Sequence, residues 1–591
     1  MSSPSVLSDI TTARTLGEVA LGAARRHKGV ALRKPGSPDV GYEELGRTVR
    51  EIAGGLAALG VEPGDRVGIL GGTIPEWTLA DFGALCTGAT VVPVYHTNSP
   101  EECEYVLAHA GVKLVILEDA KQAAKIATVR ANLPELERIV VMTGTADDAL
   151  TLAELRAQSA GDVADERVAA VAPDDTATIV YTSGTTGPPK GCVLTHANLL
   201  SMAGAYTERL GLREQPYVYF QYLPLAHVLA RMVAIVGIDT GGTLAFWSGD
   251  AKRIAEDIGA AAPTHVPTVP RLLEKIQTRA LGQATGVKGQ IFMRALRTGE
   301  RVARAKREGR SPSPIDRARH AIGDRLALSK VRAVFGPNNA IVVTGAAPIG
   351  PEVIEFFGAC GVVVLEGYGM TETCAAATLN TPAEWRVGSV GKALPGTEVA
   401  TAEDGEILMR GPHVFAGYHR NEEATAAVMR EGGWLASGDL GHVDADGYVH
   451  ITGRKKDLVI TSSGKNISPE LIESALRETP WISQAVVAGD RRSYLVALVT
   501  IDPDEAPRLA AEAGVPADMA SMAEDERVRA IVEKDIAAAN QKFAAIEQVK
   551  RFVILPRDLS QVEGELTPTL KVKRSVVYDR YATAIDRLYG D

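Results

Sequence analysis

Short apolar runs alternate with longer amphipathic stretches through the first half of the chain. The runs are rich in valine and isoleucine and cover residues 66–70, 89–94, 113–117 and 138–142. Residues 42–59 and 75–86 are instead rich in alanine and long enough to form helices. Short β-branched runs are typical of buried strands, and strands that alternate with helices form βαβ units. The pattern therefore predicts mainly parallel sheets with helices on both faces.

The pattern changes twice in the second half of the chain. Residues 382–453 consist of short strand-like runs and turns, which predicts a small β-rich subdomain. Residues 454–591 mix helix-like and strand-like stretches, and one predicted helix carries an apolar core stripe, formed by Val528, Ile531, Val532, Ile536, Ala539, Phe543 and Ile546. We expect an α/β fold with two domains. The large N-terminal domain, residues 1–453, has two mainly parallel sheets flanked by helices and includes the β-rich subdomain. The smaller α+β C-terminal domain covers residues 454–591.

Residues 280–328 form a separate segment that is rich in arginine, lysine and alanine. Its spacing predicts long helices with a break at the Ser-Pro-Ser-Pro stretch, residues 311–314. The simplest interpretation of its charges is a solvated helix face.

Composition and charge narrow the function class. At 591 residues the chain exceeds a single hydrophobic core, and about two to four domains or subdomains are expected. A net charge of −10 without a basic stripe argues against nucleic acid as the main partner. Five scattered cysteines without metal-ligand spacing are typical of reduced thiols. No secretory signal and no membrane-spanning run stands out, so we expect a cytoplasmic protein.

The stretch from Tyr181 to Gly191, YTSGTTGPPKG, has the composition of a phosphate-binding loop. It follows the strand-like run 176–180, so it leaves the carboxyl end of a buried strand. Glycines allow the backbone N–H groups to wrap around an anion, and hydroxyls and a lysine add donors and charge. The donors and glycines are Thr182, Ser183, Gly184, Thr185, Thr186, Gly187 and Lys190. The spacing of a Walker loop is absent.

This loop is followed by further blocks whose order resembles that of the adenylate-forming acyl-CoA synthetase superfamily. The blocks are LPLAHV (223–228), TGAAP (344–348), YGMTET (368–373), SGD (437–439), GRKKDLVITSSGKNISPELIE (453–473) and GELTPTLKVKR (564–574). The chain is most similar to the bacterial long-chain fatty acid branch of that family. The resemblance implies an enzyme that uses ATP and Mg²⁺ to ligate a long-chain fatty acid to coenzyme A through an acyl-adenylate, releasing AMP and pyrophosphate.

The resemblance also assigns residues to the adenylation step. Because two anions meet when a carboxylate attacks the α-phosphate, the site must neutralise charge and position groups. The family pattern implies that the Tyr181 loop binds the β- and γ-phosphates, Glu372 binds Mg²⁺ and Thr371 contacts the α-phosphate. It places Tyr368 and Gly369 with the backbone of Gly345, Ala346 and Ala347 around adenine. Asp439 is expected to accept the ribose hydroxyls, Arg454 to contact ribose and phosphate, and His227 to position the substrate.

For the C-terminal blocks, the resemblance implies a domain that moves between two orientations, one for each half-reaction. Lys571 matches the family lysine that bridges carboxylate and phosphate during adenylation, and Lys573 is its nearest competitor. Lys456 matches the hinge about which the C-terminal domain swings, which makes that domain mobile. The swing would bring Gly464, Lys465 and Asn466 to the path of coenzyme A.

Several alternatives stay open. A free-standing fatty acyl-AMP ligase would deliver the acyl group to an acyl carrier protein instead of coenzyme A. A non-catalytic acyl or nucleotide binding protein is disfavoured because the charged residues of every block are present. A luciferase-type oxygenase shares the blocks, but the 280–328 insertion and the GELTPT tail favour the fatty acyl branch. Peripheral membrane contact also stays open for an enzyme with apolar substrates, although no amphipathic anchor stands out in the sequence. The chain departs from the family pattern at Ala230, where long-chain relatives commonly carry an acidic residue before the arginine, and at residues 335–339 and 462–464. These departures bear on acyl selectivity and coenzyme A contacts, not on adenylation.

Overall fold

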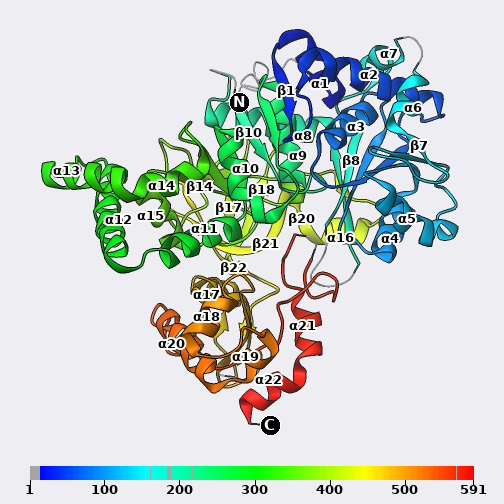
Figure 1. Ribbon diagram of the computed structural model, residues 1–591. Helices are drawn as coiled ribbons and strands as arrows, with labels where there is room; N and C mark the ends of the chain where they lie inside the picture. Colours follow the sequence, from blue (N-terminus) through cyan, green and yellow to red (C-terminus); the bar gives the residue numbers. More distant parts are fainter. Residues whose placement is uncertain are drawn as a thin grey trace.

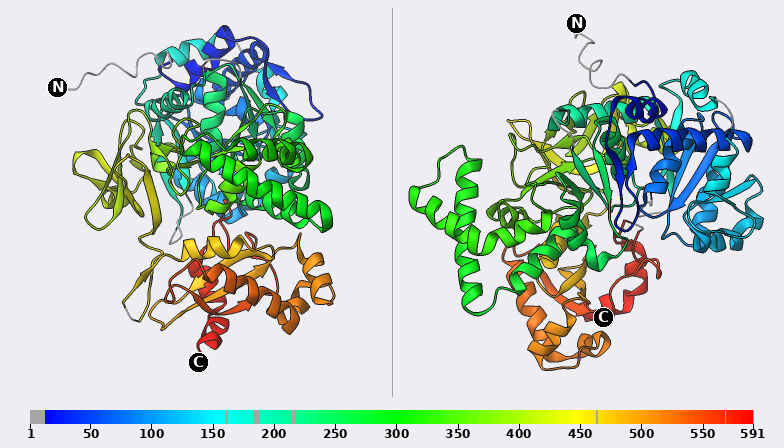
Figure 2. Two further views of the ribbon diagram at one scale, coloured as in Figure 1. Left: turned by 90° about the vertical axis from the view of Figure 1, so that its left-hand side faces the viewer. Right: turned by 45° about the horizontal axis from the view of Figure 1, so that its top comes forward.

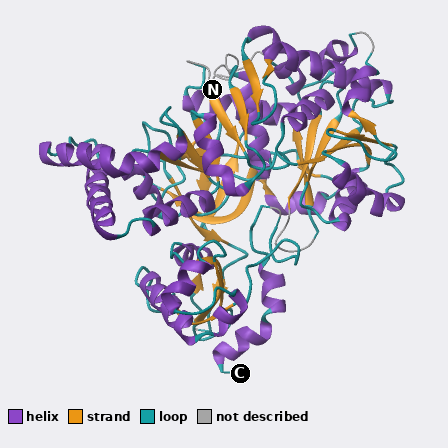
Figure 3. Cartoon of the chain, viewed as in Figure 1, coloured by secondary structure: helices purple, strands orange, loops and turns teal. Residues whose placement is uncertain are grey.

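The structure, a computed structural model, describes residues 13–159, 162–182, 188–213, 217–462, 464–567 and 569–590. It has a large upper part built on two sheets and a smaller lower part formed by the C-terminal residues (Figure 1, Figure 3). Helices lie against both sheets, as the alternating pattern predicts. The α/β fold class is confirmed.

The first sheet has the strand order β19-β9-β8-β4-β3-β5-β6-β7. Its strands are β3 (Arg66–Gly71), β4 (Thr90–Tyr95), β5 (Val112–Leu117), β6 (Arg138–Val141), β7 (Leu150–Thr151), β8 (Thr176–Thr182), β9 (Lys190–Thr195) and β19 (Gly417–Tyr418). In the part of the sheet that runs from β8 through β4, β3, β5 and β6 to β7, each strand is parallel to its neighbour. The pairs β8–β9 and β9–β19 are antiparallel. The helices of this region are α1 (Leu16–Arg26), α2 (Tyr42–Ala58), α3 (Pro75–Leu85), α4 (Pro100–Ala110), α5 (Ala120–Val129), α6 (Leu152–Ala157) and α7 (Val163–Ala170).

The second sheet has the order β16-β15-β14-β13-β12-β10-β11-β1-β2. Its strands are β1 (Val30–Arg33), β2 (Val40–Gly41), β10 (Val218–Gln221), β11 (Thr243–Phe246), β12 (His265–Thr268), β13 (Ile341–Thr344), β14 (Val363–Tyr368), β15 (Thr378–Leu379) and β16 (Lys392–Ala393). Its helices are α8 (His196–Leu210), α9 (Val228–Asp239), α10 (Ile254–Ala261), α11 (Pro270–Gly282) and α15 (Pro351–Ala359). The parallel strands β10, β12, β13 and β14 end at the same edge, which brings their following loops together.

Local signals explain where these helices begin and end. The α8 helix begins at a capping box, in which Thr195 accepts the Asn198 N–H and Asn198 caps Thr195 in return. It ends at Gly211, whose φ of 66° lies in the left-handed region that glycine adopts without strain. The same combination, Ser99 with Glu102 at the start and a left-handed Gly111 at the end, bounds α4.

A five-stranded antiparallel sheet occupies most of the predicted β-rich segment. It contains β17 (Glu398–Thr401), β18 (Glu406–Arg410), β20 (Met429–Arg430), β21 (Trp434–Val443) and β22 (Val449–Arg454), with α16 (Glu422–Val428) beside it. Two short strands of the segment leave this sheet, since β16 joins the second sheet and β19 joins the first. The β-rich segment therefore ties both large sheets together.

Residues 283–332 form a helical arm that projects from the large part of the molecule (Figure 1, Figure 2). It consists of α12 (Gly286–Arg307), α13 (Pro314–Gly323), a π-helical turn η3 (Asp324–Leu328) and α14 (Ser329–Arg332). The chain is non-helical between Arg307 and Pro314, which confirms the predicted break.

The C-terminal residues build a core of their own around a three-stranded sheet, β25 (Ile482–Ala488), β26 (Leu495–Ile501) and β27 (Val549–Ile554). Around it lie β23 (Val459–Ile460), β24 (Asn466–Ile467), α17 (Pro469–Arg477), α18 (Ala506–Ala513), α19 (Met519–Glu524), α20 (Glu526–Asn540), α21 (Arg574–Arg580) and α22 (Ala582–Tyr589).

The apolar stripe of α20 is shorter than predicted. Val528, Val532, Ile536 and Ala539 are buried. The helix ends at Asn540, whose side-chain amide exchanges two hydrogen bonds with the backbone of Val549 and so ties the helix end to β27. Phe543 and Ile546 lie beyond the helix, and Ile546 is 38% exposed. Among the described residues, no helix is both long and apolar enough to cross a membrane.

Candidate active site

The Tyr181 loop connects β8 to β9 as a hairpin. Thr182 pairs with Lys190 across the two strands, so the loop begins and ends at the same point of the sheet. The Tyr105 hydroxyl donates a hydrogen bond of 3.0 Å to the Pro189 carbonyl. The predicted phosphate-binding residues Ser183, Gly184, Thr185, Thr186 and Gly187 lie outside the described residues.

Lys190 and Glu372 are brought together by a tyrosine that the sequence analysis missed. The Tyr418 hydroxyl donates a 2.6 Å hydrogen bond to Glu372 Oε1, and Lys190 Nζ lies 5.1 Å from the centre of the Tyr418 ring. This arrangement follows from the sheet, because β19 places Tyr418 opposite Cys192, two residues after Lys190. Burial and the neighbouring Glu372 carboxylate raise the pKa of Tyr418. Its hydroxyl therefore stays protonated as a donor.

Glu372 lies in the short turn Thr371–Thr373 that follows β14. Its side chain is 6% exposed, and Thr371 is buried beside it. The Glu372 carboxylate accepts a hydrogen bond from the Tyr418 hydroxyl at Oε1, and the Cys192 thiol is a second side-chain neighbour of this carboxylate. A buried carboxylate can serve as one ligand of a hard cation whose other ligands come from phosphates and water.

Asp439 and Arg454 face each other across β21 and β22. Arg454 Nε donates to Asp439 Oδ1 at 2.8 Å, and the Tyr368 hydroxyl donates to Asp439 Oδ2 at 2.7 Å. The Asp439 side chain is 6% exposed. The three residues come from two different sheets, so this cluster fixes the β-rich segment against β14.

The backbone after β13 passes close to β14. A side chain on Gly345 would approach the Gly367 carbonyl oxygen to 2.8 Å, so only glycine fits there without movement. Ala346 has a φ of 68°, a left-handed conformation that costs about 1 kcal/mol or more for a residue other than glycine. The Gly345-Ala346-Ala347 backbone and the Tyr368-Gly369 turn therefore lie side by side at the edge of the sheet.

His227 caps the start of α9, and α9 forms one wall of an apolar cavity. Its Nδ1 accepts the Leu229 N–H at 3.2 Å. Burial, followed by the charge of Lys571, lowers the pKa of His227 to about 4, so the ring is neutral. The cavity is enclosed by α8, α9 and the strands β10, β12 and β13, and its lining residues are Tyr206, Leu210, Leu212, Tyr219, Leu229, Met232, Val233, Val236, His265, Pro267 and Val343. Two lining residues are close in sequence to the ends of their elements: Leu229 is two residues after His227, and Val343 comes just before Thr344, the last residue of β13. The cavity therefore begins near this end of the sheet.

Lys571 enters the same region from the C-terminal residues. It lies in a tight loop that Thr567 closes, because the Thr567 N–H donates to the Lys571 carbonyl at 2.8 Å and the Lys571 N–H donates to the Thr567 hydroxyl oxygen at 3.0 Å. Burial and then the Arg454 guanidinium lower the pKa of Lys571. Three carboxylates act in the opposite direction, those of Glu470, Asp439 and Glu372. Lys571 is nevertheless exposed as a residue, so the loss of solvent around its ammonium group is only partial.

The competing lysine points elsewhere. Lys573 Nζ lies 3.7 Å from Glu102 of α4, and its backbone N–H donates to the Glu565 carbonyl. Neither Lys573 nor Glu102 belongs to the cluster around Glu372 and Asp439. The two lysines that compete in the sequence therefore lie in different surroundings, Lys571 near Glu372 and Asp439 and Lys573 near Glu102.

The family assignment rests on this geometry together with sequence comparison. Residues 21–419 match the model of the AMP-binding enzyme family, and residues 456–591 match the AMP-binding enzyme C-terminal domain. This chain is an AMP-binding enzyme. It is 38% identical over 559 residues to the long-chain-fatty-acid–CoA ligase FadD15 of Mycobacterium tuberculosis, which covers 93% of this chain and 92% of that protein. A long-chain-fatty-acid–CoA ligase of Xenopus laevis is 34% identical, covering 93% of this chain and 80% of that protein.

Solved structures agree on the fold of this AMP-binding enzyme. A Mycobacterium tuberculosis fatty acyl CoA synthetase superposes with a TM-score of 0.62 at 24% identity, over 97% of this chain and 99% of that one. An anthranilate CoA ligase in complex with anthranoyl-AMP gives a TM-score of 0.74 at 21% identity, over 98% and 100% of the two chains.

Ion pairs join the C-terminal part of the AMP-binding enzyme to the large part. Arg271 of α11 bonds Asp502 at 2.6 Å, and Lys275, one turn later, bonds Asp504 at 2.7 Å. Lys542 bonds Glu352 of α15 at 2.8 Å. These contacts hold the C-terminal part in the orientation that places Lys571 beside Glu372.

The predicted hinge and the predicted coenzyme A residues lie away from this cluster. Lys456 lies exposed in the turn after β22, next to Lys455, which forms ion pairs with Asp404 and Glu406. Gly464 and Lys465 lie just before β24, and Asn466 is the first residue of that strand and pairs with Ile460. Within the part of the chain that the structure describes, no hydrogen bond or ion pair connects these three residues to the large part.

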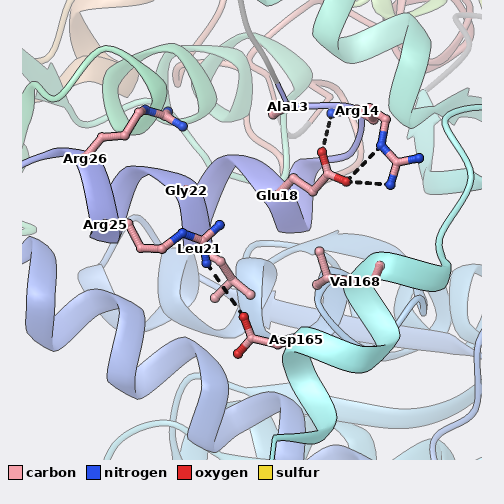
Figure 4. A pocket seen from close by; sticks show the side chains of 10 residues that line it. Ala13, Arg14, Glu18, Leu21, Gly22, Arg25, Arg26, Asp165 and Val168 are labelled. Carbon is pink, nitrogen blue, oxygen red and sulfur yellow. Dashed lines mark hydrogen bonds and ion pairs between the residues drawn. The ribbon is translucent and has the colours of Figure 1, made fainter.

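Two other features serve the fold. Arg231, which follows the sequence departure at Ala230, is buried and binds Asp81 through two hydrogen bonds of 2.8 and 2.6 Å. A surface hollow between α1 and α7 carries charges that are already paired, Arg14 with Glu18 and Arg25 with Asp165 (Figure 4). No cluster of three or more metal-ligating side chains occurs among the described residues.

Proposed function

We propose that this AMP-binding enzyme ligates long-chain fatty acids to coenzyme A through an acyl-adenylate. The observation that carries the proposal is the position of Lys571, which comes from the C-terminal part and interacts electrostatically with Glu372, Asp439 and His227, two residues before Leu229 of the apolar cavity. The curated relatives that cover over nine-tenths of the chain support the long-chain acid and coenzyme A as substrates. ATP is the co-substrate of the first step.

In the first step a carboxylate oxygen attacks the α-phosphorus of ATP, and the bond to the bridging oxygen of pyrophosphate breaks. We assign the grip on the β- and γ-phosphates to the loop from Thr182 to Lys190, and the contact with the α-phosphate to Thr371. Glu372 fits Mg²⁺, which would neutralise phosphate charge when bound. Tyr418 holds the Glu372 carboxylate in place through its 2.6 Å hydrogen bond. Lys571 supplies a positive charge between the two reacting anions.

A second set of protein groups is assigned to the adenine and the ribose of ATP. Tyr368 and Gly369 with the Gly345-Ala346-Ala347 backbone offer a flat, close-packed surface for adenine. The Asp439 carboxylate accepts hydroxyls of the ribose, and Arg454 contacts ribose and phosphate while it fixes Asp439. In this arrangement the acyl chain extends past His227 towards the apolar cavity, and the side chains that line the cavity must move apart to admit it, because its volume is only about 30 Å³.

In the second step the sulfur of coenzyme A attacks the acyl carbon, and AMP leaves. Lys571 occupies the region where the reaction takes place, so it must withdraw first. Rotation about Lys456 would break the ion pairs of Arg271 and Lys542 and bring Gly464, Lys465 and Asn466 to the large part. An acyl carrier protein is the alternative acceptor, and it would use the same first step.

Purified enzyme supplied with ATP, Mg²⁺, palmitate and coenzyme A should release AMP and palmitoyl-CoA in equal amounts. Omission of coenzyme A should leave acyl-AMP bound at no more than one equivalent per enzyme. Mass spectrometry of the acyl products checks both statements. Free acyl-AMP that accumulates in the presence of coenzyme A, without any thioester, would identify the carrier-protein ligase instead.

The cavity assignment predicts a chain-length effect. Leu229→Trp adds a large side chain at the mouth of the cavity, where Leu229 is only partly buried. We expect kcat/KM for palmitate to fall at least tenfold while kcat/KM for butyrate changes less than threefold, because only the longer chain must pass this point. A panel of acids from four to eighteen carbons measures the shift, and thermal unfolding checks that the variant is folded. Equal losses for all acids would place the acyl chain elsewhere.

A further inference from the structure

The helical arm, taken here together with the last turn of α11 as residues 279–332, has a charge opposite to that of the whole chain. It contains fourteen lysines and arginines and four carboxylates, whereas the full chain has a net charge of −10. Some of these bases are neutralised, since Arg301 binds Asp316 and Arg332 binds Asp324. Others are exposed and have no ion-pair partner among the described residues, namely Lys288, Arg294, Arg297, Lys306, Arg317, Arg319, Arg325 and Lys330. The arm therefore presents a positive surface on an acidic protein.

The same arm exposes large apolar side chains. More than half of the large aliphatic side chains that are exposed in the described part of the molecule lie here: Leu281 (37%), Val287 (73%), Ile291 (41%), Ile315 (63%), Ile322 (63%) and Leu326 (57%). Single exposed apolar residues are ordinary on protein surfaces, but a concentration in one projecting element indicates an interaction surface.

Helical geometry arranges part of this set as a stripe. Ile315, Arg319, Ile322 and Leu326 are separated by four, three and four residues, so they lie on one side of α13 and the η3 turn. A different side of α13 packs on α12, where Asp316 bonds Arg301 at 2.7 Å and Gly323 contacts Ala295. The stripe is consequently free, and two exposed arginines, Arg319 and Arg325, lie within or beside it.

We propose that this arm docks the enzyme onto an anionic lipid surface. Aliphatic side chains that stand beside exposed arginines match the two parts of such a surface, because the aliphatic groups enter the acyl region while the guanidinium groups bind lipid phosphates. A nucleic acid or another polyanion would bind the lysine and arginine side chains of the arm but would leave the exposed isoleucines without an apolar partner. The proposal goes beyond the ligase activity, and it does not depend on which acid the enzyme accepts.

Sedimentation with vesicles tests the proposal on the full-length enzyme. The wild type should bind phosphatidylcholine vesicles that contain 30% phosphatidylglycerol, and binding should fall at least tenfold on pure phosphatidylcholine or in 0.5 M salt. The apolar variant Ile315→Ser/Ile322→Ser/Leu326→Ser and the charge variant Arg294→Gln/Arg319→Gln/Arg325→Gln should each lose at least fivefold in vesicle affinity. All six positions are exposed, so both variants should keep wild-type thermal stability and wild-type activity on butyrate.

Matched controls replace residues of the same kind elsewhere on the surface. Val562→Ser removes a 95% exposed aliphatic side chain, and Lys121→Gln/Arg138→Gln/Lys534→Gln removes three exposed bases. Both controls should bind vesicles as the wild type does. The proposal is overturned if the apolar variant binds normally, because the arm is then a general polyanion surface, or if the controls lose as much as the arm variants. Self-association of the wild type that the apolar variant abolishes, without vesicle binding, would identify a contact between copies instead.

Discussion

Lys571→Ala should abolish adenylation while it leaves thioester formation from a supplied acyl-adenylate nearly intact. The lysine stands among Arg454, Asp439 and Glu372 in the orientation of this structure, where a carboxylate and a phosphate must approach each other. Removal of one such charge typically costs about 10²–10³ in rate. Carboxylate-dependent exchange of pyrophosphate into ATP measures the first step alone, and we expect a loss of this size there.

The matched control is Lys573→Ala, since Lys573 lies two residues away and pairs with Glu102 instead. That variant should keep both half-reactions within about threefold of the wild type, because an exposed ion pair contributes little. A second control is wild-type and Lys571→Ala enzyme given synthetic palmitoyl-AMP and coenzyme A, which should form palmitoyl-CoA at similar rates. If exchange survives in Lys571→Ala but fails in Lys573→Ala, the two roles are reversed.

The strands of the two large sheets could be predicted closely from the sequence. Runs such as 66–70 and 113–117 became β3 and β5 with shifts of one residue at an end. This succeeded because strands buried on both faces are continuous apolar runs. The predicted apolar stripe of α20 was too long because it, too, was based on spacing alone. Its 3.6-residue spacing continues past Asn540, whereas the helix stops where that side chain binds Val549.

The site residues could be proposed from motifs, but their partners could not. The choice between Lys571 and Lys573 depends on which way a loop of the C-terminal part faces, and no local spacing records that direction. Tyr418 escaped notice because its short strand leaves the β-rich segment and pairs with β9. The sequence offered only a weak signal for Tyr418, namely its position directly after Gly417 in the segment between the phosphate loop and the hinge. Strand exchange between sheets is a tertiary event, and sequence periodicity does not reveal it.

A graded pair of substitutions, Glu372→Gln and Tyr418→Phe, should separate the charge of the carboxylate from its orientation. Glu372→Gln removes the charge that suits Mg²⁺, and we expect kcat/KM for ATP in the exchange reaction to fall by about 10²–10³. Tyr418→Phe keeps the charge and the ring beside Lys190 but deletes the hydrogen bond to Glu372 Oε1. A hydrogen bond to a charged group is worth about 1.5–3 kcal/mol, so its loss corresponds to at most about tenfold to a hundredfold.

Magnesium titration distinguishes these roles from a loss of packing. In Tyr418→Phe a higher Mg²⁺ concentration should restore most of the rate, because the Glu372 carboxylate is still present but less well held. In Glu372→Gln saturating Mg²⁺ should restore little, since no side-chain oxyanion remains at that point. Glu423→Gln, an exposed carboxylate on α16 near Tyr418, is the matched control and should behave as the wild type. An unchanged Mg²⁺ dependence in both variants would remove Glu372 from the metal site and leave its bond with Tyr418 as a structural contact between the two sheets.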